Sequence, residues 1–212
     1  MSESSPQLIR FLQQENARLK EDNDTLREEN QILRRYMTAL QELHQATQEI
    51  STEENLINLL NEILGYAMSL LGAEGGSLAL LDDETDELVF VVVHGDISDQ
   101  LRDYRLKKDV GIAGWVAMHQ EPLIVQNPRQ DHRFSPEVDK TFNFYTRSIL
   151  CVPMVAGRKL IGVIQLLNRQ DDAPFDKTDV MLLSILSHIA ATALEEMRLH
   201  LEAEDEAAEI KS

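Results

Sequence analysis

The first fifty residues show a seven-residue repeat of apolar positions. Leucine fills the d position of five successive heptads, at Leu12, Leu19, Leu26, Leu33 and Leu40. Asparagine fills the a position of three successive heptads, at Asn16, Asn23 and Asn30. A sustained seven-residue repeat with leucine at d is typical of a coiled coil, and an isolated amphipathic helix does not need it. The pattern predicts a coiled coil over residues 8–50.

Charged residues beside the leucines predict how the strands are arranged. Acidic g positions are followed five residues later by basic e positions in three pairs, Glu15–Lys20, Asp22–Arg27 and Glu29–Arg34. In a parallel homodimer these positions meet across the interface, so each pair brings opposite charges together. Asparagine at a buried a position lowers stability but favours two strands in a single register. We therefore expect a parallel homodimer.

From residue 51 onward the pattern is that of a globular domain. Ser51 and Glu54 match a capping box, and the apolar residues that follow have the spacing of an amphipathic helix that ends at Gly72. A second long helix is predicted from about Lys177, with an apolar face that fades near residue 202. The acidic stretch 202–212 is expected to be a solvated tail.

Between these helices the chain has the pattern of two β-hairpins. Apolar runs at 76–81 and 88–93 are separated by an acidic turn, and runs at 148–155 and 160–168 are joined by four turn residues. Antiparallel hairpins with flanking helices predict an α+β fold, in which the sheet carries helices grouped on one face.

A longer and less regular insert separates the two hairpins. It contains a helix start at 111–116, an apolar run at 122–125 and a loop rich in proline, aspartate and asparagine at 126–141. Irregular inserts of this kind often carry binding residues above a rigid scaffold. We expect the insert to form the lid of a pocket on the face of the sheet opposite the long helices.

Net charge narrows the range of partners. The chain carries 37 acidic and 20 basic residues, a formal net charge of −17 at pH 7. Such a surface repels the phosphates of nucleic acids and of anionic membranes. A basic-region zipper protein is also excluded, because it needs a basic helix ahead of the heptads and Arg10 is the one basic residue among the first ten. We expect neither nucleic acid nor a membrane as a partner.

Apolar stretches and cysteine content indicate the compartment. The longest apolar runs are much shorter than the roughly 20 residues needed to cross a bilayer. Residues 1–10 lack the basic start and apolar run of a signal peptide. Cys151 is the single cysteine, so it has no partner for an intramolecular disulfide. We therefore expect a cytoplasmic protein.

Four ordered segments carry a resemblance to a known family. They are 111–116 (Gly-Ile-Ala-Gly-Trp-Val), 122–134, 148–153 and 161–166. Together they resemble the GAF domain, the small-molecule sensor module of cyclic-nucleotide phosphodiesterases, adenylyl cyclases and many bacterial signalling proteins. The resemblance covers residues 52–201 and implies the GAF fold.

A signature motif extends this resemblance. The family's Asn-Lys…Phe-x3-Asp-Glu pattern is matched at Asn168, Phe175 and Asp179, while Arg169 replaces the lysine and Val180 the glutamate. In the family this signature is linked to an ion pair behind the pocket, and Arg169 can form such a pair with Asp179. The resemblance implies kinship with nucleotide-type modules.

Candidate ligand contacts follow from chemistry and from the resemblance. A helix N-terminus binds anions, and Gly111 and Gly114 permit close approach, so the amides of Ile112 and Ala113 are the expected anion contacts. By resemblance to nucleotide-binding members, the retained contacts are Ser77, Ile112, Ala113, Asp139 and Thr146. The positions changed from the cyclic-GMP binders are Val93, His94, Ser135, Phe142 and Gln165. These changes disfavour guanine, whereas His94 and Gln165 can both donate and accept, as an adenine edge or another polar ligand requires.

Catalysis and metal binding find little support in the sequence. The histidines lack metal-ligand spacing, and we find no nucleophile triad, phosphate loop or paired-carboxylate motif. Cys151 lies in an apolar run, where a thiol is inert, and GAF-like methionine sulfoxide reductases use several cysteines. We expect no enzyme and no metal. Haem held by His119 or His132 stays open as a minor alternative.

These observations favour a homodimeric, cytoplasmic regulatory protein whose GAF domain binds a small molecule, with a cyclic nucleotide as one candidate. Only about ten residues follow the last helix, which is too few for an output enzyme. We therefore expect occupancy to be transmitted through the helices to a partner protein. The alternative is a ligand-free dimerisation or scaffold protein that uses the GAF fold for interaction only.

Overall fold

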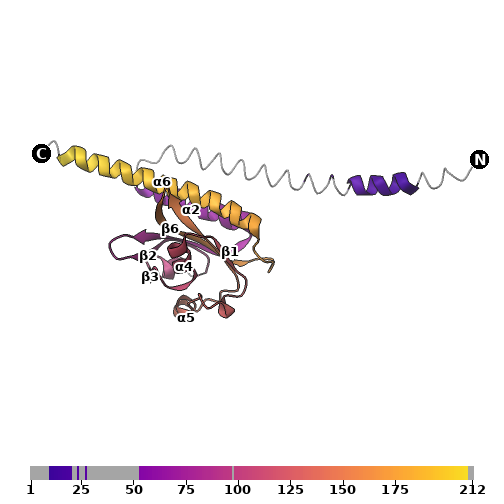
Figure 1. Cartoon of the computed structure of the whole chain (residues 1–212), viewed down its shortest axis with the longest axis horizontal. Coiled ribbons are helices and arrows are strands. Elements are labelled where there is room, and N and C mark those ends of the chain that lie inside the picture. The colour runs from indigo at the N-terminus through magenta and orange to yellow at the C-terminus, as the bar shows by residue number, and fades with distance from the viewer. Residues whose placement is uncertain (1–9, 21–22, 24–26, 28–52, 97, 210–212) are drawn as a thin grey trace, which may run out of the picture. The chain divides into compact units, whose positions relative to one another are not determined.

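The computed structural model describes residues 10–20, 23, 27, 53–96 and 98–209, and the chain divides into two units, residues 1–42 and 43–212 (Figure 1). In the first unit residues 10–20 form a helix. Leu12 and Leu19 are 49% and 53% exposed, as the d positions of a single coiled-coil strand would be. The other predicted d positions and Asn30 lie outside the described residues. The coiled coil over 8–50 stays a prediction.

The second unit is built on a six-stranded antiparallel sheet with the strand order β3-β2-β1-β6-β5-β4. The strands are β1 (Ala73–Asp82), β2 (Glu87–His94), β3 (Arg105–Lys107), β4 (Leu123–Val125), β5 (Ile149–Ala156) and β6 (Lys159–Arg169). The helices are α2 (Glu53–Leu71), α3 (Ser98–Leu101), α4 (Gly111–His119), the 3-10 helix η1 (Pro128–Gln130), α5 (Glu137–Phe142) and α6 (Lys177–Glu209). Both predicted hairpins, β1–β2 and β5–β6, are confirmed.

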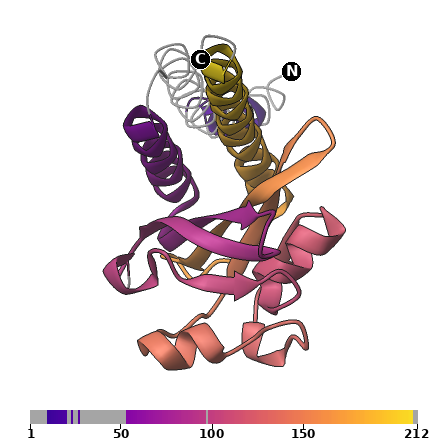
Figure 2. The same ribbon diagram turned by 90° about the vertical axis from the view of Figure 1, so that its left-hand side faces the viewer.

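Helices α2 and α6 lie side by side on one face of the sheet (Figure 2). Leu60 and Ile63 of α2 and Leu183 of α6 are fully buried there, among side chains from alternate positions of the central strands. Ser187 of α6 also donates a hydrogen bond to the carbonyl oxygen of Pro153 in β5, at 2.7 Å. The α+β class with the long helices on one face is confirmed.

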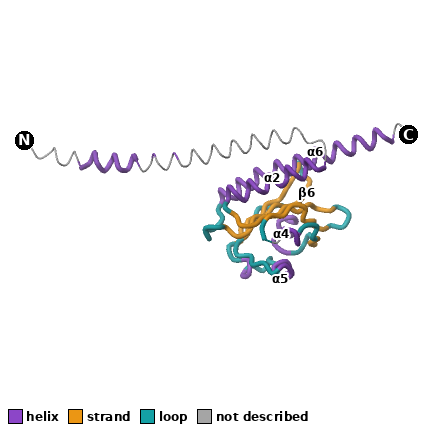
Figure 3. The backbone as a smooth tube through the Cα atoms, turned by 180° about the vertical axis from the view of Figure 1, so that it is seen from behind, coloured by secondary structure: helices purple, strands orange, loops and turns teal. Residues whose placement is uncertain are grey.

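The insert between the hairpins covers the opposite face. Ile112 and Val116 of α4 pack there against Val93 and Cys151, which come from the other set of alternate strand positions. Figure 3 shows the sheet between the long helices and the segment that carries α4 and α5. Residues 126–146, which include η1 and α5, are termed the lid below.

One described helix is long and apolar enough for a membrane span, over Lys177–Ala203 of α6. Packing in the core of the domain also accounts for the apolar residues of this helix. Leu183, Leu186 and Ala190 are buried in the core between α2, α6 and the sheet. A core helix of this kind meets the same criteria of length and composition.

His94 differs from its expected position as a ligand contact. Neighbouring residues of a strand point to opposite faces, and Val93 takes the face covered by α4. His94 therefore points toward α2, where its Nε2 lies 3.2 Å from Oδ1 of Asn61. Because Asn61 Nδ2 already donates to the Ile57 carbonyl oxygen, its Oδ1 faces the imidazole and Nε2 carries the proton. The structure thus places His94 on the opposite face of the sheet from Val93, one strand position away from the face where we expected a ligand contact.

Replacing Gly162 by alanine tests the packing of the two central strands. A Cβ at Gly162 would lie 2.1 Å from the carbonyl oxygen of Ala79, so β1 and β6 would have to separate. We expect a loss of about 2 to 3 kcal/mol in the free energy of unfolding, measured with urea. The matched control is Gly65→Ala in α2, where the nearest atom would be 3.7 Å away. Alanine there should stabilise the helix by up to about 1 kcal/mol. Equal effects of the two substitutions would contradict the close approach.

His94 should make stability depend on pH. Burial, and secondarily the positive charge of Arg102, lowers the pKa of His94 below its ordinary value of 6.5. Protons therefore bind the unfolded chain first, so stability is fully present above pH 6.5 and falls as the pH drops from there toward the lower pKa of the folded state. His94→Gln should flatten this part of the curve in urea unfolding. The control His132→Gln, at a side chain that is 92% exposed, should leave it unchanged. An unaltered slope in His94→Gln would show that another group is responsible.

Candidate functional site

A row of side chains crosses the sheet beneath α4. The strand register places Val93 beside Ser77, Ser77 beside Gln165 and Gln165 beside Cys151. Directly paired residues in an antiparallel sheet point to the same face, so all four face α4. Gln165 Nε2 donates to Ser77 Oγ at 2.9 Å. The register thus brings together three of the predicted ligand contacts, and it puts a polar pair on a largely apolar surface.

Two glycines allow the start of α4 to pack closely against the loop that precedes it. Gly111 has a positive φ of 72°, and a Cβ at Gly114 would lie 2.7 Å from the Lys108 carbonyl oxygen. The N-cap residue is Val110, whose apolar side chain cannot accept from the first amides of the helix. The amides of Ile112 and Ala113 are therefore at a helix start without a side-chain cap, as the predicted anion contact requires. Ser135 from the lid lies next to Gly111.

The two other retained contacts, Asp139 and Thr146, bind each other. Asp139 Oδ1 accepts from the Thr146 hydroxyl at 2.6 Å, and Oδ2 accepts from the Thr146 amide at 3.1 Å. Arg129 donates to the same Oδ2 at 2.8 Å, and its guanidinium lies 4.4 Å from the ring centroid of Tyr145. Both carboxylate oxygens of Asp139 are thus in use. In this structure the pair ties α5 and η1 to the end of the lid.

A chain of aromatic contacts joins the lid to the sheet. Phe142 meets Tyr104 edge-on at 5.5 Å between ring centroids, and Tyr104 packs against Phe90 at 6.3 Å. Ser77 and Ile112 are only 2% and 3% exposed. A ligand that touches these residues therefore needs the lid or α4 to move outward.

Surface hollows lie beside this region. One, of about 340 Å³, is lined by both ends of the lid, with Arg129, Tyr145 and Arg147 among its walls. Another, of about 520 Å³, lies by the β1–β2 turn and includes Lys108 and Met118. Neither is the enclosed pocket expected under residues 126–146.

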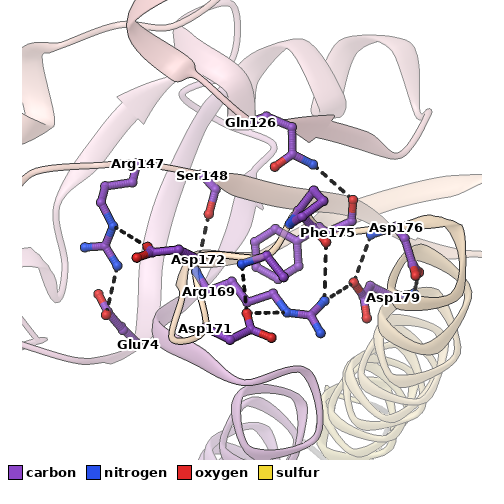
Figure 4. A network of polar contacts seen from close by, with 12 residues as sticks. Glu74, Gln126, Arg147, Ser148, Arg169, Asp171, Asp172, Phe175, Asp176 and Asp179 are labelled. Carbon is purple, nitrogen blue, oxygen red and sulfur yellow. Dashed lines mark hydrogen bonds and ion pairs between the residues drawn. The ribbon is translucent and has the colours of Figure 1, made fainter.

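The signature residues lie where β6 leads into α6 (Figure 4). The predicted ion pair is present, with 2.7 Å between Arg169 Nη1 and Asp179 Oδ2. The Asp179 side chain is 10% exposed and the Arg169 side chain 24% exposed, so solvent screens this pair only in part. The Arg169 guanidinium also lies 5.9 Å from the ring centroid of Phe175, which is buried in the core. Arg169, which stands where the family signature has lysine, thus forms the ion pair with Asp179.

Chemistry at Cys151 is restricted by burial. Its thiol is fully buried, and burial raises the pKa far above the ordinary value, which disfavours the reactive thiolate. Among the described residues, no group of three histidine, cysteine, aspartate or glutamate side chains is placed to hold a metal ion.

Sequence reasoning missed residues whose roles depend on long-range contacts. Arg129 on Asp139, Gln126 on the Phe175 carbonyl and Asn61 on His94 join positions far apart in the chain or lie in irregular loops. Neither periodicity nor spacing points to them. Cys151 was placed in its strand, but only the register shows that it adjoins Gln165.

Comparison with known proteins agrees with this architecture. The model of the GAF domain family matches residues 55–194. Among solved structures, the GAF domain of a phosphoenolpyruvate-protein phosphotransferase from Coxiella burnetii is similar, with a TM-score of 0.66 and 22% identity over 78% of this chain and 97% of that chain. The free methionine-R-sulfoxide reductase of Neisseria meningitidis has the same fold, with a TM-score of 0.61 and 20% identity over 78% of this chain and 93% of that one.

Two curated relatives each match about two thirds of this chain or slightly less. The probable 3',5'-cyclic phosphodiesterase pde-5 of Caenorhabditis elegans is 30% identical over 148 residues, which are 66% of this chain and 20% of that protein. The dual 3',5'-cyclic-AMP and -GMP phosphodiesterase 11A of Takifugu rubripes is 31% identical over 147 residues, 61% of this chain and 16% of that protein. This chain therefore spans a fifth or less of the length of these two relatives. By the family match over most of its length and by its fold, the chain belongs to the GAF domain family.

Proposed function

We propose that the GAF domain binds a small polar molecule between the sheet and the lid, and that the helices transmit its binding to a partner protein. The observation that carries this proposal is the Ser77–Gln165 pair, a polar group on the face covered by α4. The uncapped amides at the start of α4 supply a second feature of a ligand site, a place for an anion. The phosphodiesterase relatives support a signalling role.

A cyclic nucleotide is our first candidate for the ligand, because the two relatives are named for cyclic-nucleotide hydrolysis. Gln165 would read the base, since its amide both donates and accepts. Asp139 is less suited to this task, because Arg129 and Thr146 already occupy its carboxylate. His94 and Gln165 were the two residues considered for contact with the base. Because His94 lies on the other face of the sheet, we assign this contact to Gln165.

A ligand-free scaffold is the second candidate. The packing of Phe142 against Tyr104 and the near-complete burial of Ser77 and Ile112 favour it, because they leave little room under the lid as it stands. For either candidate we propose binding and not catalysis. The buried thiol of Cys151, with its raised pKa, supports this choice, because a nucleophilic cysteine must be accessible and ionised.

Dimerisation through the N-terminal heptads is part of the proposal. Helix α6 adds exposed apolar side chains to this proposal: Met181, Ile185, Leu199 and Leu201 are 58%, 42%, 52% and 50% exposed. Met181 and Ile185 lie one helical turn apart on the same face of α6, where such a pair is suited to contact with a partner helix. We propose that this assembly acts in the cytoplasm through a separate protein.

Thermal unfolding with added nucleotides separates the two candidates. A ligand that binds only the folded state at one hundred times its dissociation constant should stabilise it by about 2.7 kcal/mol. We expect this from cyclic AMP or a related small molecule, and we expect Gln165→Leu to abolish the shift. Gln170→Leu, at an exposed side chain just beyond β6, is the matched control and should keep it. No shift with cyclic AMP, cyclic GMP or a panel of common metabolites would favour the scaffold.

Valine in place of the three a-position asparagines tests the coiled coil. Asn16, Asn23 and Asn30 replaced together should raise the melting temperature, because buried amides are lost, and should weaken the preference for two strands. Sedimentation should show a dimer before the change and a mixture of larger assemblies after it. A monomer in both proteins would refute the dimer.

A further inference from the structure

Residues 168–176, termed the connector, run from the end of β6 to the start of α6. They hold both ends of the lid and the first turn of α6 (Figure 4). None of these contacts touches the Ser77–Gln165 pair. Their arrangement therefore calls for a role apart from ligand contact.

The far end of the lid is held by Asn168. Its Oδ1 accepts from the Arg147 amide at 2.7 Å, and its Nδ2 donates to the Tyr145 carbonyl oxygen at 3.0 Å. Asn168 is 2% exposed and has a positive φ of 56°, a conformation that asparagine tolerates better than most residues. Arg147 adds an ion pair to Glu74 at 2.8 Å. The chain that leaves the lid is thus anchored on the connector.

The near end of the lid is held by Gln126. Its Nε2 donates to the carbonyl oxygen of Phe175 at 3.0 Å, across 49 positions of the sequence. The ring of Phe175 is buried in the core shared by α2 and α6. A displacement of Gln126 therefore either breaks this hydrogen bond or moves the backbone just ahead of α6.

The other end of the connector forms the cap of α6. Asp176 Oδ1 accepts from the amides of Thr178 and Asp179, at 2.7 and 3.0 Å. Asp179 Oδ2 in turn accepts from the Asp176 amide at 2.9 Å and from Arg169 at 2.7 Å. These bonds make the first turn of α6 and the connector one hydrogen-bonded unit. The Gln170 amide also donates to the Gly72 carbonyl oxygen, where α2 ends, at 2.8 Å.

We propose that the connector couples the position of the lid to the first turn of α6, with Gln126 and Asn168 as the positioning residues that link them. This inference rests on the proposed function, because it names the route by which occupancy under the lid reaches an output helix. When the lid moves outward to admit a ligand, strain passes through the two amide side chains to Phe175 and Arg169. The cap of α6 then loosens or tightens with the lid.

Hydrogen exchange on the full chain without ligand tests the coupling. Asp139→Asn disturbs the lid from within, because it weakens the contacts of Asp139 with Arg129 and Thr146, and it leaves the connector untouched. We expect faster exchange in the lid and also at the amides of Thr178, Asp179 and Val180. A change of about fivefold would match the loss of one ordinary hydrogen bond.

Asp139→Asn is then introduced into a variant that already carries Gln126→Ala and Asn168→Gly. Glycine keeps the positive φ at position 168 while it removes the amide. In this variant Asp139→Asn should still speed up hydrogen exchange in the lid. It should no longer speed up exchange at the amides of residues 178–180. Gln130→Ala, at an exposed lid residue, is the matched control and should preserve that effect. If Asp139→Asn does not fold, Thr146→Val removes only the hydroxyl contact, and if Asn168→Gly does not fold, Gln126→Ala alone should reduce the effect.

Two results would overturn the inference. One is faster exchange in the lid with no change at 178–180, and the other is an equal change there with and without the positioning residues. Neither depends on a ligand. A failed ligand screen with intact coupling would therefore reject only the proposed function, and lost coupling with a bound ligand would reject only this route.

Discussion

The alternation of side chains along β1 and β6 is the constraint on which the rest of the domain depends. Both strands are central, so each must bury both of its faces. Leu78 and Ile164 pack beneath α2 and α6, while Ser77 and Val163 face α4. Gly162 allows the two backbones to approach closely at one end. A shift of register by one residue would exchange the two faces and destroy both layers.

Polar groups then determine how tightly the lid is closed. Arg129, Asp139 and Thr146 tie its middle together, while Gln126 and Asn168 fix its ends. In the described part of the chain, every buried side-chain nitrogen or oxygen has a hydrogen-bond partner. Opening of the lid must therefore exchange these bonds for bonds to ligand or water, because a buried polar group without a partner is costly. A ligand able to replace some of them would lower that cost.

Local patterns in the sequence predicted most elements of the second unit. The acidic turn after β1, the glycine turn after β5 and the helix start at Lys177 all appear where period and turn residues indicated. The Arg169–Asp179 ion pair was predicted from the family signature. His94 lies on the other face of the sheet from the one we expected, because the face of a strand residue depends on exact alignment and changes with a shift of one position. The packing of Phe142 against Tyr104 and the hydrogen bond from Arg129 to Asp139 form only when the lid folds back on itself. The spacing of residues along the sequence does not predict such contacts. The N-terminal heptads remain a prediction.

The burial of Cys151 has a practical consequence for spectroscopy. The chain has no other cysteine, and this thiol is shielded by the sheet and by α4. Maleimide reagents should therefore leave the folded wild-type protein unlabelled, so a cysteine introduced at any exposed position would become a unique attachment point. Pairs of such positions on the lid and on α6 would allow fluorescent or spin labels to report distances in a protein that needs no background cysteine removed.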